Sequence, residues 1–213
     1  MQDFRNFSEN RLHTLFSKGR IVSYTSTNQH FDNFRLIAQI SENLGIAEVL
    51  LRNKIDFIMC GLDSAWIDNL PSDIKIDKPK NEPNPTHDKL VSFQSLGFWV
   101  KVAEFYKIEG KIFDKEFLDS LDFKRYYAGN ANRFKDKANL QNYQKANLLI
   151  HLLRNLRNRA FHFENLYKLN DENKPRLIAT VENDKKSLCV INLATDKIQV
   201  FLNDLIDELS KTS

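Results

Sequence analysis

Apolar residues recur at helical spacing over a long stretch of this chain, from about residue 27 to residue 60. A period of three to four residues is that of an α-helix with one buried face. Ser26 or Thr27 supplies an N-cap, and Gly45 marks a weak point or a close approach by another helix. Because a long apolar stripe must be covered, a helix of this length favours a helical bundle. The apolar positions are Phe31, Phe34, Leu36, Ile37, Ile40, Leu44, Val49, Leu51, Ile55 and Ile58.

The composition agrees with a mainly all-α fold. The chain has 16 phenylalanines against 6 glycines and 5 prolines, which favours long helices over a turn-rich β architecture. Its 42% hydrophobic and 28% charged residues are typical of a globular protein. A length of 213 residues suits one domain with an ordinary core. We therefore expect a single domain over residues 1–213.

Two further helices are predicted in the first half of the chain. The first runs from about Ser8 to Lys18 and ends at Gly19. The second begins after Thr86 and continues to Phe105, and it is apolar nearly all round, as in a helix at the centre of a bundle. The intervening residues 71–85 contain four prolines and are expected to form an exposed loop.

The second half combines helices with one change of period. Residues 117–134 are aromatic and basic and are expected to be irregular or short-helical, and a long helix is predicted over 138–166. Two β-rich runs around a polar turn then indicate a hairpin over residues 176–193. A C-terminal helix over 195–211 follows, capped by Thr195. We interpret the hairpin and this last helix as an appendage.

Cysteine content and charge restrict the functional classes. Two isolated cysteines, Cys60 and Cys189, make neither a disulfide framework nor a zinc motif, and they are expected to be buried thiols in a reducing cytosol. The start of the chain, Met1–Arg5, shows no signal peptide, and no apolar run reaches membrane-spanning length. We expect a cytoplasmic protein without a membrane partner. A net charge of +3 permits RNA as a partner without requiring it.

The most informative chemistry lies between Leu153 and Glu164, where a helical stretch carries three arginines, two asparagines and a histidine. A guanidinium holds a phosphate through two parallel hydrogen bonds, and an imidazole moves a proton near neutral pH. Arg157 and His162 are five positions apart, so on a straight helix their side chains point about 140° apart. Either the helix bends or ends between them, or a second copy completes the site across a two-fold axis.

Such a site would cleave RNA without a metal or another cofactor. The ribose 2′-hydroxyl is the nucleophile, His162 is the general acid or base, and Arg157 stabilises charge on the phosphoryl oxygens. Asn158 orients the histidine or a phosphate oxygen. The alternative from spacing alone is a solvated basic face, which is the commoner state of arginines on a helix.

The segment from Arg157 to His162 resembles the signature of the HEPN superfamily, in which an Arg, a polar residue and three further residues precede a His. More of the chain resembles the Abi-like (abortive infection) branch of bacterial HEPN proteins, with three blocks in the same order over most of residues 8–168. The blocks are Glu48–Ile55, similar to the first long helix, Leu96–Val100, similar to a central apolar segment, and Leu156–Glu164, similar to the block Leu-Arg-Asn-Arg-Ile-Ala-His-His-Glu.

The resemblance implies an HEPN-like all-α bundle that forms a homodimer, with metal-independent endoribonuclease toxins among its members. It implies that Arg157 and His162 are the catalytic pair and Asn158 the supporting polar residue. Other residues expected to bind substrate or brace the same cleft are Arg154, Arg159, Glu48, Arg52 and Asn53, although a set of helix-packing ion pairs is an equal alternative for the last three.

Two positions depart from the family pattern. Phe163 replaces the second histidine, and Glu164 stands where some HEPN toxins present a tyrosine for modification by an antitoxin. Control by that kind of antitoxin is therefore in doubt, although another antitoxin is compatible with the sequence. The leading hypothesis is an RNase toxin in phage defence. The alternatives are a non-catalytic module that binds RNA or a partner protein, and a structural protein in which the arginines bridge subunits.

Overall fold

The structure is a computed structural model that describes residues 4–80 and 82–211. It is mostly helical with one two-stranded antiparallel sheet near the C-terminus, as the composition and periodicity predict. The predictions that fall on residues 1–3, on Asn81 in the proline-rich loop and on residues 212–213 lie outside the described residues. No helix among the described residues has both the length and the apolar character that a membrane crossing requires.

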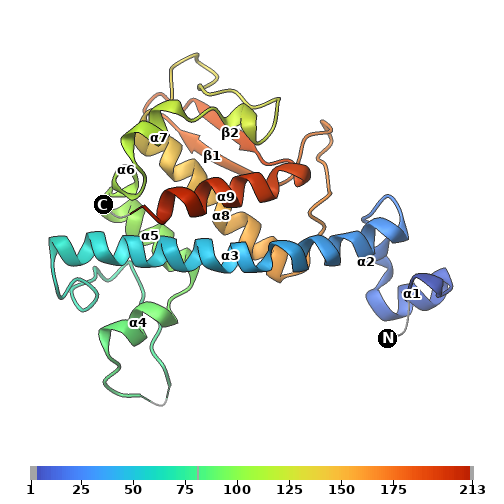
Figure 1. Cartoon of the computed structure of the whole chain (residues 1–213), viewed down its shortest axis with the longest axis horizontal. Coiled ribbons are helices and arrows are strands. Elements are labelled where there is room, and N and C mark those ends of the chain that lie inside the picture. Colours follow the sequence, from blue (N-terminus) through green and yellow to red (C-terminus); the bar gives the residue numbers. More distant parts are fainter. Residues whose placement is uncertain (1–3, 81, 212–213) are drawn as a thin grey trace.

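The long helix predicted from the apolar period is α3, Thr27–Leu62. The Ser26 hydroxyl accepts a hydrogen bond from the backbone N–H of Gln29 at 3.2 Å and caps it. One face of α3 is buried along its length, and the helix crosses the molecule between α4 (His87–Phe93) on one side and the sheet on the other (Figure 1). The buried residues of this face include Ile37, Ile40, Leu44, Ala47, Leu51, Ile55 and Met59.

Four other helices cover that face. Three of them, α5, α8 and α9, are long enough to carry several turns, and α6 is a single turn. Each packs against α3, and α8 also contacts α5 and α6, so the bundle centres on α3 and α8. Their bounds are α5 Leu96–Tyr106, α6 Glu109–Ile112, α8 Asn142–Phe161 and α9 Ile198–Leu209.

The helix that carries the motif, α8, is shorter at both ends than the predicted 138–166. Gln141 and Gln144 form a capping box that begins the helix. At the other end, the backbone N–H of Phe163 donates to Ala160 O at 2.9 Å, and that of Glu164 donates to Arg159 O at 2.8 Å. These two bonds define a Schellman motif, with Phe163 in the left-handed conformation at φ 52°. The chain therefore turns away directly after His162.

The N-terminal helix predicted over 8–18 is two helices. A short 3₁₀ turn, η1 (Phe4–Asn6), precedes α1 (Glu9–Phe16) and α2 (Lys18–Ile21). The break falls at Ser17, whose φ is 64°, and not at Gly19, which lies inside α2. Both helices lie at the far N-terminal end of α3, away from the bundle centre (Figure 1).

The helix predicted from Thr86 to Phe105 is also divided, into α4 (His87–Phe93) and α5. The Ser95 hydroxyl accepts from the Phe98 backbone N–H at 3.3 Å and starts α5 afresh. The Gln94 amide nitrogen donates to the Leu90 and Asp77 carbonyls at 2.8 Å, which ends α4. Helix α4 and its loop lie on the other side of α3 from the sheet (Figure 1).

Residues 117–134, predicted to be irregular or short-helical, contain the end of α7 (Lys115–Ser120) and η2 (Phe123–Arg125) and are otherwise irregular, as predicted. The predicted hairpin is present as β1 (Ile178–Glu182) and β2 (Leu188–Asn192), with Thr180 opposite Val190. A 3₁₀ turn, η3 (Thr195–Lys197), leads into α9.

The hairpin and α9 share the core of the helices. Ile191 of the sheet and Phe201 and Leu202 of α9 are fully buried in the same apolar cluster as α3 and α8. Helix α8 also packs against β1. The segment interpreted as an appendage is therefore an integral part of the domain core.

Candidate functional site

The motif residues lie in the last turns of α8 and at the position that follows it. His162 is the C-cap of this helix, with φ −89° and ψ 4°, and it is exposed. Asn158 lies four residues before it and is also exposed, so the two side chains share one strip of the helix surface. Arg154 lies one turn further back on the same strip. No hydrogen bond or ion pair within the described chain occupies the side chains of these three residues.

Arg157 is held by a carboxylate of the neighbouring helix. Its Nε donates to Oε2 of Glu48 on α3 at 3.0 Å, and the two side chains are 33% and 20% exposed. The guanidinium lies 5.2 Å from the ring centroid of Phe161, one turn further along α8. Only Nε is used within the described residues, so the two terminal nitrogens remain available to a ligand. Arg157 and His162 are not in hydrogen-bond contact with each other.

The other two residues of α3 expected at the site behave differently. Nη1 of Arg52 donates to the carbonyl of Ser92 in α4 at 3.4 Å, and its Nε is buried without a hydrogen-bond partner. Asn53 is exposed to solvent. The structure thus brings Glu48 to Arg157, directs Arg52 towards α4, and leaves Asn53 outside both contacts.

The backbone that follows His162 is fixed by residues far away in the sequence. Asn33 of α3 is buried, and its amide nitrogen donates to Glu164 O at 3.0 Å while its amide oxygen accepts from Leu166 N at 2.9 Å. Nη1 of Arg20 in α2 donates to Phe163 O at 3.0 Å. These bonds hold both sides of the turn, so the exposed His162 stands on an ordered backbone.

Arg159 lies on the opposite side of α8 from Arg157 and lines a basic pocket of about 360 Å³. Burial lowers the pKa of Arg159, and the nearby Arg176 lowers it further, whereas Glu164 acts in the opposite direction. The Glu164 carboxylate also lines this pocket, 3.8 Å from Nη1 of Arg159, so the cations leave a net positive lining that favours an anion. We define the basic pocket by its four cations, which are Arg20, Arg159, Lys168 and Arg176.

Sequence reasoning missed Asn33, Arg20, Lys168 and Arg176. Asn33 had a signal, because it is a polar residue on the buried face of α3, and such a residue requires hydrogen-bond partners. The three cations had none. They come from separate segments that only the fold brings together.

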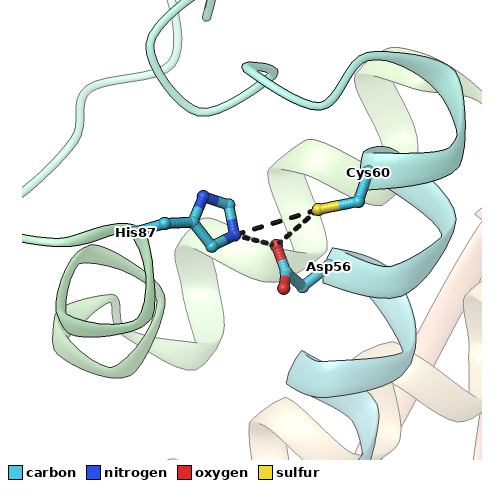
Figure 2. A group of neighbouring side chains, drawn as sticks. All are labelled: Asp56, Cys60 and His87. Carbon is cyan, nitrogen blue, oxygen red and sulfur yellow. Dashed lines mark hydrogen bonds and ion pairs between the residues drawn. The ribbon is translucent and has the colours of Figure 1, made fainter.

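A second polar cluster lies beyond Arg52 on α3 and is drawn in Figure 2. Nε2 of His87 lies 2.9 Å from Oδ1 of Asp56, and Sγ of Cys60 lies 3.7 Å from that oxygen and 3.9 Å from Nε2. Cys60 is exposed, contrary to the expectation of a buried thiol, because the buried face of α3 at this point is carried by the preceding residue, Met59. Cys189 is buried, as expected. Among the described residues, this is the one group of three possible metal ligands.

The cluster is not arranged as a nucleophilic triad. In such a triad, one imidazole nitrogen faces the carboxylate and the other faces the thiol. Here the same nitrogen, Nε2 of His87, faces both (Figure 2). Cys60 is exposed, but the partial loss of hydration around its sulfur, followed by the Asp56 carboxylate, raises the pKa of the thiol, which favours the unreactive thiol over the thiolate.

Comparisons with protein-family models, with curated proteins and with solved structures give no match to this chain.

Proposed function

We propose that this protein is a metal-independent endoribonuclease of the Abi-like HEPN kind, a toxin that acts in phage defence. The observation that carries the proposal is the exposed end of α8, where Arg157 keeps two guanidinium nitrogens for a ligand and His162 is exposed beside Asn158. A phosphate-binding group and a proton-transfer group are thus presented by one helix end. Those are the two functions that cleavage by a ribose 2′-hydroxyl requires.

The proposed roles follow from these contacts. Arg157 stabilises negative charge on the phosphoryl oxygens, Glu48 positions it through Nε, and His162 exchanges protons with the 2′-hydroxyl or the leaving oxygen. Asn158 orients a phosphate oxygen or the imidazole. The basic pocket, which includes Arg159, holds the RNA backbone beyond the scissile bond through its phosphates.

A homodimer is part of the proposal. Arg157 and His162 diverge on one helix, so Arg157 of one chain and His162 of its partner would complete a site across a two-fold axis. Phe161 and Phe163 flank His162 and are 44% and 43% exposed. A second copy of the chain would cover this apolar surface.

The first experiment measures cleavage of total RNA in EDTA by the wild type, Arg157→Ala and His162→Ala. Arg125→Ala is a matched control, because Arg125 also pairs with a carboxylate but lies elsewhere. We expect the wild type and the control to cleave and both site variants to lose at least about 100-fold in rate. Equal cleavage by His162→Ala and the wild type would contradict the proposal.

The second experiment mixes the two inactive variants. If Arg157 and His162 come from different chains, an Arg157→Ala/His162→Ala heterodimer contains one intact site. Random exchange at equal amounts then restores about a quarter of the wild-type activity. No recovery after exchange, verified by tagged chains, would place each site within a single chain and contradict the shared site.

A non-catalytic module that binds RNA is the second candidate, and the basic pocket favours it because it contains four cations and no histidine. This function predicts RNA binding without cleavage. Binding should weaken in Lys168→Ala and Arg176→Ala but not in His162→Ala. A filter-binding assay at several salt concentrations distinguishes it from the nuclease.

A further inference from the structure

The cluster of Asp56, Cys60 and His87 joins the C-terminal half of α3 to the first residue of α4 (Figure 2). The three side chains offer a carboxylate oxygen, a sulfur and an imidazole nitrogen, and these atoms all lie within 4.8 Å of one another. They point at a common centre. Asp56 and Cys60 are one turn apart on α3, so they share one side of the helix, which His87 meets from α4.

The separations fit the size of a metal ion. A tetrahedral zinc ion with bonds of about 2.3 Å to sulfur and about 2.0–2.1 Å to nitrogen and oxygen holds its ligand atoms about 3.3–3.6 Å apart. The separations here are 2.9 Å between nitrogen and oxygen, 3.7 Å between sulfur and oxygen, and 3.9 Å between sulfur and nitrogen. Shifts of a few tenths of an ångström would bring all three into range, which changes of side-chain torsion supply.

The donor set selects the metal. Calcium and magnesium prefer oxygen ligands alone, whereas thiolate, imidazole and carboxylate together suit zinc. The indole Nε1 of Trp66 donates to Oδ1 of Asp56 at 2.9 Å, and Trp66 is 1% exposed. A buried donor of this kind fixes the orientation of a ligating carboxylate from the second coordination layer.

We propose that Asp56, Cys60 and His87 bind one Zn²⁺, with a fourth coordination position open to solvent. On binding, the thiol of Cys60 releases its proton to solvent and coordinates as the thiolate. His87 coordinates through Nε2 and carries its proton on Nδ1, which faces away from the other two ligands (Figure 2). The site shares no residue with the proposed ribonuclease site and does not depend on it.

The ion would tie α4 to α3. His87 follows Asp56 by 31 positions, and the chain between them includes the end of α3 and the proline-rich loop, so the metal would close a long connection that already packs into the core through Trp66 and Ile74. A ligand that binds the folded chain and not the unfolded chain raises its stability by mass action. Binding of Zn²⁺ should therefore raise the melting temperature of the protein.

The test uses the full chain, reduced and freed of metal with a chelator. Zn²⁺ is added in the presence of a colorimetric competitor, and Co²⁺ is used in parallel as a spectroscopic probe. We expect one Zn²⁺ per chain and a thiolate-to-cobalt charge-transfer band in the near ultraviolet. Cys60→Ser should abolish the band and weaken Zn²⁺ binding by at least about 100-fold, as should His87→Ala. Cys189→Ser is the matched control and should keep both.

Thermal unfolding separates a lost site from a lost fold. The metal-free melting temperature of Cys60→Ser should match that of the metal-free wild type, because Cys60 is exposed, and only the wild type should gain on addition of Zn²⁺. Three results would overturn the site: no stoichiometric Zn²⁺ in the wild type, a Co²⁺ complex without the thiolate band, or unchanged affinity in Cys60→Ser. None of these measurements involves RNA, so they stand apart from the outcome of the cleavage assays.

Discussion

Arg125 and Arg157 each pair with a carboxylate on a neighbouring helix, but they use the guanidinium differently. Arg125 donates from Nε and Nη2 to the two oxygens of Asp204, at 2.7 and 3.0 Å. Arg157 donates to Glu48 from Nε alone, at 3.0 Å. The Arg125–Asp204 pair is bidentate, so each carboxylate oxygen accepts one guanidinium hydrogen bond. The Arg157–Glu48 pair leaves both terminal nitrogens of the guanidinium available to a ligand. The two pairs therefore differ in how many guanidinium nitrogens they leave unengaged, and the proposed role of Arg157 uses that difference.

The largest expected effect is on the rate of RNA cleavage, and it compares substitution of Arg157 with substitution of Arg125. Arg157→Ala should lower the rate of RNA cleavage at least about 100-fold, because it removes the guanidinium proposed to stabilise charge on the phosphate. Arg125→Ala should keep the wild-type rate per folded molecule. Single-turnover cleavage of a labelled RNA measures both. If the two variants lose activity equally, the comparison fails.

Glu48→Gln should have a smaller effect on the same reaction. The amide still accepts a hydrogen bond from Nε of Arg157 but has no charge, so the guanidinium is held less firmly. We expect kcat to fall about tenfold with KM nearly unchanged, since positioning acts on the transition state. A change in KM alone would show that Glu48 acts on RNA binding and not on the orientation of Arg157. Asp204→Asn serves as the control on the other pair.

The stability of the region around Arg125 and Asp204 should depend on pH in the alkaline range, through Tyr126. Burial, and then the neighbouring Asp204 carboxylate, raise the pKa of Tyr126, whose hydroxyl donates to Asp204 at 3.1 Å. A raised pKa contributes stability that is complete below the ordinary tyrosine value and is lost as the pH rises above it. One unit above that value, the wild type should lose about 1.4 kcal/mol more than Tyr126→Phe. Urea unfolding near pH 8 and near pH 11 measures the difference. Equal losses would contradict it.

The smallest effect is expected for the stability of Arg125→Ala. Its side chain is 59% exposed, so solvent screens the pair with Asp204, and the free energy of unfolding should fall by less than about 1 kcal/mol. Chemical denaturation at low and high salt checks this value. A loss several times larger would mean that the bidentate geometry outweighs the screening.

Much of the fold could be predicted because its signals are local. The apolar period of α3, the two β-rich runs of the hairpin and the apolar face of α9 are each contained in one segment. The errors fall where a polar side chain or a backbone turn interrupts the apolar pattern. Gln94 and Ser95 divide a helix that the pattern continues, and the Schellman turn at Phe163 ends α8 early.

The candidate site was only partly predictable for a different reason. The motif in α8 was predicted from its own residue types and from a family resemblance, Glu48 was predicted from the resemblance alone, and the structure pairs Glu48 with Arg157. The contacts of Asn33, Arg20 and His87 join residues that are far apart in the sequence. These contacts depend on where the connecting segments place their residues against the helices, and a local sequence pattern does not predict that placement.

The spacing of four residues along α3 has a geometric consequence. Glu48, Arg52, Asp56 and Cys60 each follow the last by four positions, and each step rotates about 40° and rises about 6 Å. From Glu48 to Cys60 the strip therefore winds about 120° around the helix while it climbs about 18 Å. Glu48, beside the proposed ribonuclease site, and the proposed zinc site therefore lie on different sides of the same helix. If the proposed activity holds, a protein bound over α4 would leave Arg157 accessible, and inhibition would require covering the end of α8 or displacing α3.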